Sequence, residues 1–492
     1  MKNLLFIRSS VFSILLAAGF SVDATVYYVD KGHPQASDQN TGIEQEAPWA
    51  TLSKAAQVLE AGDTVLVKSG IYNTVMKGFT PDSGVDAVVK PQNSGEEGRP
   101  IEFKAMQGEK VIIEPGYDAQ GFFIAGKSYI TIEGFEIRYG SGGIVVASGL
   151  GRMNGIRIVE NYIHHIGAPI ANSSAIRLDD VDSAYVGNNL VHNISNFGHE
   201  NNNGMGVLSY NMLNVIFENN EFHTSDKGIY HKGPYLTGDT GIVIRNNLIH
   251  DTVRALEFHN NEASDASQSG TKIYQNIIVN NDTPIYDTTY QSAHENVGFE
   301  IYNNTFHNTG GLTIRGLSEV SFFNNIISGP TERTVQTVYQ SHVFETPSIR
   351  KAPSFSFVDY NLYAGNFSAR LGLYSGAEVN FYSLSEWQSV TSSTADAVSL
   401  EQSVFPIDAH SIAANAGFVD PASYNFRLQE SSPAVGAARN GLNIGAYTTG
   451  REIIGLLPGF RHVNRNSVSP LVEGAGAGVG EAAPASIELR VQ

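Results

Sequence analysis

The sequence contains no cysteine, few basic residues and no long apolar run beyond its first two dozen residues. Without cysteine, a disulfide framework is excluded. The 31 Lys and Arg stand against 49 Asp and Glu, and the formal net charge of −18 argues against a nucleic-acid-binding protein, which needs a basic face. No later segment is long and apolar enough to span a membrane as a helix, so we expect no membrane span. Glycine, with 49 residues, is abundant and indicates many tight turns.

The N-terminus has the pattern of a secretory signal peptide at residues 1–24. Lys2 and Arg8 supply positive charge, residues 11–20 are mostly apolar, and the three residues ending at Ala24 fit a cleavage site. The apolar run is too short for a membrane helix. We therefore expect a secreted or periplasmic protein whose mature chain starts near Thr25.

One phrase recurs along the chain: alternating apolar residues, then Asn or Asn-Asn, then a further short strand. The last Asn of each phrase falls at intervals of 28, 31, 27, 29, 28 and 21 residues: Asn161, Asn189, Asn220, Asn247, Asn276, Asn304 and Asn325. A period of this length with short strands is typical of a parallel β-helix, whose coils stack at about 4.8 Å. The sequence therefore predicts an all-β, right-handed parallel β-helix as one domain over residues 25–450.

The repeated Asn residues predict a ladder of stacked side-chain amides at one turn of every coil. Histidines follow these turns with the same spacing: His165, His192, His223, His250 and His307. Because whole coils separate them, we interpret them as stacked turn residues rather than metal ligands.

The two ends of the solenoid need covers, because a terminal coil exposes an unpaired strand edge. Residues 25–75 predict an N-terminal cap and first coil, in which Thr51 or Ser53 starts a short amphipathic helix that ends before Gly62. Residues 330–450 predict degenerate last coils, with an insertion over 330–350. Residues 451–492, rich in Gly, Ala, Ser and Pro toward the end, predict a C-terminal tail. The opening resembles those of secreted β-helix carbohydrate-active enzymes.

A second strand precedes each Asn phrase, and we align these strands by their first inward apolar residue: Ile144, Ile176, Met205, Ile229, Leu256, Ile285 and Leu312. Since side chains alternate, the next residue and the third residue face outward, and the second faces inward. This places Lys232 and His259 in one outward column of neighbouring coils, about 5 Å apart at the backbone. Tyr230 and Glu257 lie beside them. His231 and Asp287 are expected to face inward, which is unusual for charged side chains.

Lys232, His259, Tyr230 and Glu257 are our candidate catalytic residues, because such a set suits β-elimination of a uronate polymer. The reaction needs a base for the proton α to the carboxylate, a cation to neutralise that carboxylate, and an acid for the leaving oxygen. Lysine beside other cations and histidine can each act as the base. The candidate substrate-binding residues are Arg177, Asp179, Arg254, Arg315, Tyr235 and Tyr290, the two tyrosines on loops that could wall a groove.

The phrases GIYHKG and GLTIRG resemble those of the polysaccharide lyase family that contains alginate lyases and chondroitinase B. The resemblance implies that Lys232 is a catalytic base and that an Arg follows about one coil later, where this chain has His259. It also implies a Ca²⁺ ion held by acidic residues one coil before the Lys, where the chain reads GMGVLSYN. The expected partner is an acidic polysaccharide, the expected protein a monomer, and the metal ligands stay unassigned.

Three other functions fit the same fold. A glycoside hydrolase needs two carboxyl groups about 5–10 Å apart, and Glu257 could pair with the loop acids Asp239, Glu262 or Asp265. A C5-epimerase of uronate polymers shares the proton abstraction. A repetitive outer face would favour a non-catalytic polysaccharide-binding surface protein. Here the outer face changes from apolar to polar after Arg177.

Overall fold

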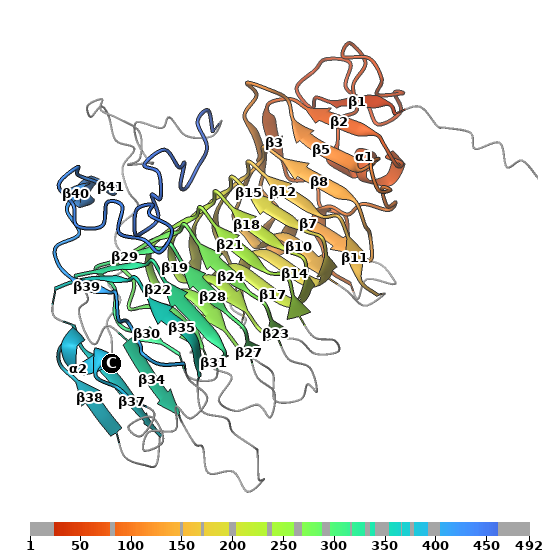
Figure 1. The fold of residues 1–492 in the computed structure, drawn as a ribbon. Helices are drawn as coiled ribbons and strands as arrows, with labels where there is room; N and C mark the ends of the chain where they lie inside the picture. Colours follow the sequence, from red (N-terminus) through yellow and green to blue (C-terminus); the bar gives the residue numbers. More distant parts are fainter. Residues whose placement is uncertain are drawn as a thin grey trace, which may run out of the picture.

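The structure, a computed structural model, describes residues 24–78, 84–147, 151–168, 172–195, 203–233, 239–259, 268–287, 296–314, 317–329, 335–339, 354–365, 367–373, 378–391 and 404–460. Strands stack into the long coil of a parallel β-helix (Figure 1), and this confirms the predicted fold class. Among the described residues no helix has the length and apolar character needed to cross a membrane.

One side of the helix is a sheet of twelve strands, all joined by parallel pairing. In spatial order it contains β1 (Val26–Val29), β2 (Thr64–Val67), β5 (Ile101–Ala105), β8 (Ile130–Glu133), β12 (Arg157–Val159), β15 (Tyr185–Gly187), β18 (Ile216–Glu218), β21 (Val243–Arg245), β24 (Lys272–Tyr274), β28 (Glu300–Tyr302), β32 (Val320–Phe323) and β35 (Phe355–Asp359).

The second sheet wraps the remaining sides, and its longest strands bend around a corner. It contains β3 (Gly70–Tyr72), β4 (Ala87–Val89), β6 (Val111–Ile113), β7 (Gly116–Ala125), β9 (Glu136–Arg138), β10 (Gly140–Ala147), β11 (Met153–Asn154), β13 (Tyr162–Gly167), β14 (Ser174–Asp182), β16 (Leu190–Ser195), β17 (Met205–Leu213), β19 (Glu221–His231), β20 (Asp239–Thr240), β22 (Leu248–Phe258), β23 (Gln268–Ser269), β25 (Ile277–Val279), β26 (Thr283–Asp287), β27 (Asn296–Val297), β29 (Thr305–His307), β30 (Leu312–Thr313), β31 (Leu317–Ser318), β33 (Ile326–Ser328), β34 (Val335–Tyr339), β36 (Leu362–Ala364), β37 (Ala369–Leu373), β38 (Glu378–Phe381) and β39 (Ile412–Ala413).

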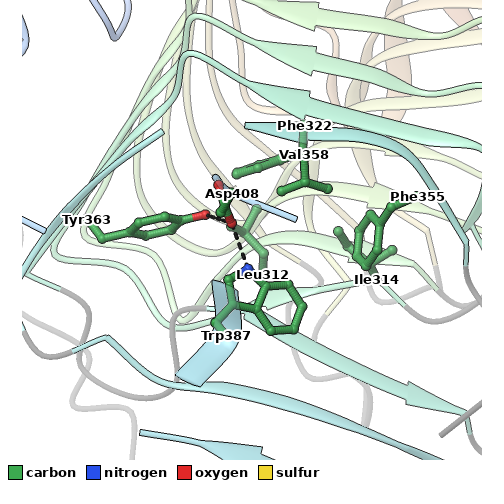
Figure 2. Close-up of a pocket in the computed structure, with 8 residues that line it drawn as sticks. All are labelled: Leu312, Ile314, Phe322, Phe355, Val358, Tyr363, Trp387 and Asp408. Atoms are coloured by element: carbon green, nitrogen blue, oxygen red, sulfur yellow. Dashed lines mark hydrogen bonds between the residues drawn. The ribbon is translucent and has the colours of Figure 1, made fainter. Parts of the chain in front are cut away.

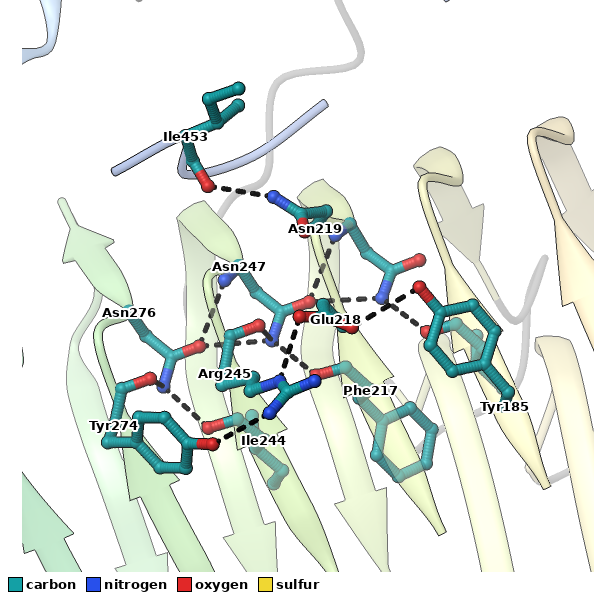
Figure 3. A network of polar contacts seen from close by, with 12 residues as sticks. Tyr185, Phe217, Glu218, Asn219, Ile244, Arg245, Asn247, Tyr274, Asn276 and Ile453 are labelled. Atoms are coloured by element: carbon teal, nitrogen blue, oxygen red, sulfur yellow. Dashed lines mark hydrogen bonds and ion pairs between the residues drawn. The ribbon is translucent and has the colours of Figure 1, made fainter. Parts of the chain in front are cut away.

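The predicted asparagine ladder is present and fully buried. Each side-chain Nδ2 donates to the Oδ1 of the Asn in the next coil, as from Asn247 to Asn276 at 3.0 Å (Figure 3). The residue before each ladder Asn has a positive φ, for example 54° at Asn246, a conformation that Asn tolerates well. The ladder continues one step further than predicted, from Asn325 to Asn361 at 3.2 Å, across a spacing of 36 residues.

The histidine column is also present, with one correction. Rings of His192, His223 and His250 stack at centroid distances of 4.6 and 4.7 Å. The ring that stacks before them is His164, paired with His192, and not His165, which occupies the corner with a φ of 52°. Val279 interrupts the column before His307, so His307 does not stack on His250.

The predicted register of the second strand holds in most coils. Ile144, Ile176, Ile229, Leu256 and Ile285 belong to one inward column, as expected. The exception lies in β17, where the residue in this column is not Met205. Val207 pairs with both Ile176 and Ile229, and it is the residue that continues the column. Met205 lies two residues earlier, at the start of the strand. The outward residues of that coil are therefore Leu208 and Tyr210, not Gly206 and Leu208.

His231 and Asp287 face inward as predicted, with 1% and 0% exposure. They lie two coils apart and have separate polar partners. The Nδ1 of His231 lies 3.1 Å from the hydroxyl of Ser209, and the Nδ2 of Asn296 donates to Asp287 at 3.3 Å. The strand register therefore does not slip at either residue.

Both ends of the solenoid are covered by short helices. At the N-terminal end, α1 (Leu52–Val58) is capped by Thr51, whose hydroxyl accepts from the backbone N–H of Lys54, and it buries Leu52 and Ala55. This confirms the predicted capping helix. At the other end, α2 (Leu384–Gln388) places Trp387 over the core.

A buried carboxylate ends the asparagine ladder beneath α2 (Figure 2). Asp408 accepts hydrogen bonds from the hydroxyl of Tyr363 at 2.8 Å, from the indole of Trp387 at 2.6 Å and from Nδ2 of Asn361 at 3.0 Å. Burial raises the pKa of Asp408, although these donors oppose the rise. The pocket around it is lined mainly by apolar side chains and belongs to the core.

The C-terminal part of the chain returns along the outside of the coil (Figure 1). It contains β40 (Phe418–Asp420), a short 3₁₀ turn at Pro421–Ser423 and β41 (Asn425–Leu428), and its apolar residues pack on Leu248, Ile277 and Ile326. Ile453 accepts from Asn219 at 2.8 Å (Figure 3), and Gly455 donates to Asn246. Residues 451–460 are thus packed and are not a tail, and residues 461–492 lie outside the described residues.

Candidate functional site

The polar part of the outer surface is carried by neighbouring strands β14, β17, β19, β22 and β26. In β19 and β22, Lys227 pairs with Arg254 and Tyr230 pairs with Glu257. In the next coil, Tyr286 follows Glu257. The coil spacing of about 4.8 Å therefore holds these side chains in two parallel rows.

Lys232 and His259 directly follow the ends of β19 and β22, and their backbones continue the parallel pairing of these strands. The backbone N–H of Lys232 donates to Ser209 at 2.8 Å, and that of His259 donates to His231 at 2.9 Å. Burial lowers the pKa of His259 to about 4, and the charges of Lys232 and Lys227 add to this effect. The structure thus brings together the predicted pair, with a neutral imidazole beside an ammonium group at pH 7.

Glu257 is the centre of a buried ion-pair network and is only 3% exposed. Its Oε2 lies 2.9 Å from Nη1 of Arg254 and 3.5 Å from Nζ of Lys227. Burial, together with the charge of Arg254, lowers the pKa of Lys227, although Glu257 opposes this. The carboxylate holds both cations in place on the outer face.

Lys227 is a site residue that the sequence reasoning missed. We counted outward positions from the first inward apolar residue of each strand, and Lys227 lies two positions before Ile229. One signal could have found it: Lys227 and Arg254 are 27 residues apart, the same spacing as Asn220 and Asn247.

Aromatic rings support the cations of this face. The ammonium of Lys227 lies 4.5 Å from the ring centre of Tyr230, and the guanidinium of Arg254 lies 4.0 Å from that of Tyr286. Cation–π contacts of this kind restrict the long basic side chains without neutralising them. Tyr230 is 7% exposed, so its ring is part of the support beneath the surface.

Arg177 and Asp179 form a separate pair on β14, two coils before β19. Nη2 of Arg177 lies 2.7 Å from Oδ2 of Asp179, and the guanidinium lies 5.5 Å from the ring centre of Tyr210. Burial raises the pKa of Asp179 despite this contact. Arg177 therefore lies on the same outer face as Lys232, about 10 Å along the coil axis.

Arg315, Tyr235 and Tyr290 lie outside the described residues, as do Glu262 and Asp265.

The described part of the chain contains one group with the geometry of a metal site: Glu221, His223 and His250. These residues lie around a corner of the coil from Lys227, and the coil before Lys232 carries no acidic side chain on its outward positions Leu208 and Tyr210.

No family model matches this sequence. It is 24% identical over 480 residues to the uncharacterized protein YwoF of Bacillus subtilis (strain 168), a match that covers 82% of this chain and 91% of that protein. Similar solved structures include the pectate lyase Pel9A, at 14% identity and a TM-score of 0.48, covering 87% of this chain and 97% of that one. Another is a mannuronic acid specific polysaccharide family 6 lyase from human gut microbiota, at 16% identity and a TM-score of 0.40, covering 65% and 73%.

Proposed function

We propose that this protein is a polysaccharide lyase that acts outside the cytoplasm and cleaves a uronic-acid-containing polymer, alginate-like or glycosaminoglycan-like, by β-elimination. The observation that carries the proposal is the pairing of His259 with Lys232 on the outer face of two neighbouring coils. One is a neutral base at pH 7 and the other an adjacent cation. The overall charge of −18 gives the protein no general attraction for an acidic polymer, so binding depends on this local face.

In the proposed reaction, the imidazole of His259 takes the proton from the carbon α to the uronate carboxylate. Lys232 neutralises that carboxylate, into which the negative charge moves. The glycosidic C–O bond on the β carbon then breaks as the carbon–carbon double bond forms. The imidazolium of His259 returns its proton to the leaving oxygen, so atoms and charges balance without a further reactant.

The remaining residues of the face have supporting roles in this proposal. Arg254 and Arg177 bind carboxylates of neighbouring sugar units, since a guanidinium can hold a carboxylate with two hydrogen bonds. Glu257 and Tyr230, both nearly buried, are positioning residues that hold Lys227 and Arg254. Tyr286 lies under Arg254 in the same way.

A hydrolase using Asp179 and Glu257 fits the geometry less well. The two residues lie on β14 and β22, which are three coils apart, or about 14 Å along the axis. Hydrolases need their carboxyl groups about 5–10 Å apart. Glu257 is also committed to two cations and is not directed to solvent.

The test is ultraviolet absorbance of the mature protein mixed with alginate, pectate, chondroitin, hyaluronan or ulvan. Each polymer is assayed with added Ca²⁺ and with chelator, because the resemblance to alginate lyases implies a Ca²⁺ requirement. β-Elimination creates a conjugated unsaturated uronate, so absorbance should rise on one of these polymers.

Lys232→Ala and His259→Ala should each reduce the rate at least about 100-fold. The matched controls are Lys272→Ala on β24 and His410→Ala, both exposed and away from this face. If no polymer gives absorbance while reducing ends accumulate, the protein is a hydrolase and the proposal is wrong.

A further inference from the structure

A second cluster of chemically active side chains lies on the short arm of β19 and on β22, around the corner from the proposed lyase site. Glu221 and His223 are two residues apart on β19, so their side chains lie on the same face of the strand. His250 pairs with His223 in the next coil. One ligand atom from each of the three residues lies within 4.8 Å of the others.

Glu221 is the unusual member, because its side chain is fully buried and only half of its carboxylate has a partner. Oε1 lies 3.4 Å from Nε2 of His250, whereas Oε2 is buried without a hydrogen bond. A buried carboxylate oxygen without a hydrogen bond is energetically unfavourable. Oε2 is therefore a buried acceptor that can serve as a ligand atom.

We propose that Glu221, His223 and His250 bind one divalent transition-metal ion of the zinc class. Two imidazole nitrogens and one carboxylate oxygen are a ligand set that zinc accepts, with a fourth position left for water. Glu221 supplies the negative charge, and Oε2 becomes a ligand instead of an unpaired acceptor. The site is independent of the proposed lyase reaction and uses none of its residues.

The outer hydrogen bonds of both histidines suit this role. Nδ1 of His250 lies 2.7 Å from Oδ2 of Asp251, and the hydroxyl of Tyr424 donates to the same oxygen at 3.0 Å. Nδ1 of His223 lies 2.9 Å from the hydroxyl of Thr224. Histidines that bind metals commonly use one ring nitrogen for the metal and the other for such a partner, which leaves Nε2 of both rings for the ion.

Around a tetrahedral zinc ion with bonds of about 2.0–2.1 Å, ligand atoms lie roughly 3.4 Å apart. In the cluster the ligand atoms lie within 4.8 Å of one another, so metal binding requires the side chains to turn toward the ion.

The position of the site gives it a structural consequence. Tyr424 belongs to the C-terminal segment that covers the coil, and it contacts both Asp251 and His250. A bound ion would fix β19, β22 and, through Asp251 and Tyr424, the covering segment. Metal binding should therefore raise the melting temperature, because a ligand that binds only the folded state stabilises it.

The experiment is titration of the chelator-treated, dialysed full chain with Zn²⁺ by calorimetry. We expect one high-affinity equivalent and a higher melting temperature. Glu221→Gln, which preserves shape, and His223→Ala should each weaken binding 10-fold or more. The matched control is His307→Ala, further along the same face and separated from the cluster by Val279, which should bind Zn²⁺ like the wild type.

A second measurement uses Co²⁺ on the unmodified chain, so it does not depend on whether a variant folds. Tetrahedral coordination gives intense visible absorption bands that Zn²⁺ should remove by displacement. The proposal is overturned if the wild type binds no Zn²⁺, or if Glu221→Gln and His223→Ala bind it as tightly as His307→Ala does. In that case His250 is an imidazolium held between Glu221 and Asp251.

Discussion

At the scale of single residues, the cations of the outer face are held in place by a carboxylate that is itself buried. Glu257 is the residue on which this arrangement depends, because it contacts Arg254 and Lys227 together. The Lys227 side chain is 11% exposed and that of Arg254 is 33% exposed. Water would therefore not fully solvate these two cations if the carboxylate of Glu257 were removed.

Glu257→Gln should lower the free energy of unfolding by roughly 2–3 kcal/mol, because it leaves two partly buried cations without their shared carboxylate. Asp179→Asn is the matched comparison on the same face. Burial already raises the pKa of Asp179 and Arg177 is 39% exposed, so this change should cost less than about 1 kcal/mol. Urea unfolding of both variants is the measurement, and equal losses would contradict the role given to Glu257.

The pH dependence of activity should follow His259. The base must be neutral, and the pKa of His259 is lowered to about 4, so activity is present above this pH and is lost as pH falls through it. Lys232 contributes to the lowering, so Lys232→Gln should raise the pKa of His259. NMR titration of labelled histidine checks the pKa directly in both proteins. A pKa near 6.5 that does not change on substitution would refute this electrostatic account.

The sequence predicted the pairing of Lys232 with His259 because both follow an inward apolar residue by the same count. It could not predict that Tyr230 and Glu257 lie almost entirely beneath the surface. Tyr230 packs with Met205, Leu208 and Tyr210, and Glu257 pairs with Lys227 and Arg254. Contacts of this kind do not follow from the alternation of side chains alone.

At the scale of the repeated elements, the Asn-Asn doublet has two separate tasks. The first residue takes the left-handed conformation, as Asn246 does with a φ of 54°, and the second joins the buried ladder, as Asn247 does. This division explains why the first position also accepts Glu160, Gln275 and Tyr360, whereas the second is always Asn over the ladder.

Asn247→Ala should therefore destabilise the protein by about 3 kcal/mol, because it removes the acceptor of the Asn220 backbone N–H, the acceptor of one side-chain N–H of Asn220 and a donor to the carbonyl of Phe217. Asn246→Gly should change stability by less than about 0.5 kcal/mol, because glycine accepts a positive φ. Thermal and urea unfolding separate the two results. A similar loss of stability in both variants would show that the ladder position does not contribute more to stability than the residue before it.

The strand register could be predicted where each strand starts with one inward apolar residue. It failed at β17 because Met205 and Val207 are both apolar, and the sequence does not say which of them continues the inward column. Val207 does, whereas Met205 pairs with Lys227 and packs with Leu208 and Tyr230. The ladder step to Asn361 was missed because a spacing of 36 residues hides the repeat.

At the scale of the whole molecule, the chain folds back on its own solenoid. Phe426 is 1% exposed and packs with Phe418 and His307 on the outside of the coil. This return was not predictable from periodicity, because residues 404–460 contain few strands and make their contacts with coils more than a hundred residues earlier.

Phe426→Ala should loosen this segment at a cost of about 3 kcal/mol, since it removes a large buried ring. Val419→Ala, at a position 50% exposed on the same strand pair, should have little effect. Limited proteolysis with mass-spectrometric mapping is the measurement, and new cleavage should appear between residues 404 and 460 only in Phe426→Ala. Equal protection of both variants would mean that the ring does not anchor the segment.

The most direct test of the central claim is the mass of the products formed from the active polymer in water enriched in heavy oxygen. Elimination by His259 and Lys232 predicts that each new chain end on the uronate side is lighter by one water molecule and carries no heavy oxygen. Hydrolysis would instead leave a saturated uronate end without loss of water and would place the heavy oxygen on the new reducing end of the other product, and that result would contradict the assignment of this face as a lyase site.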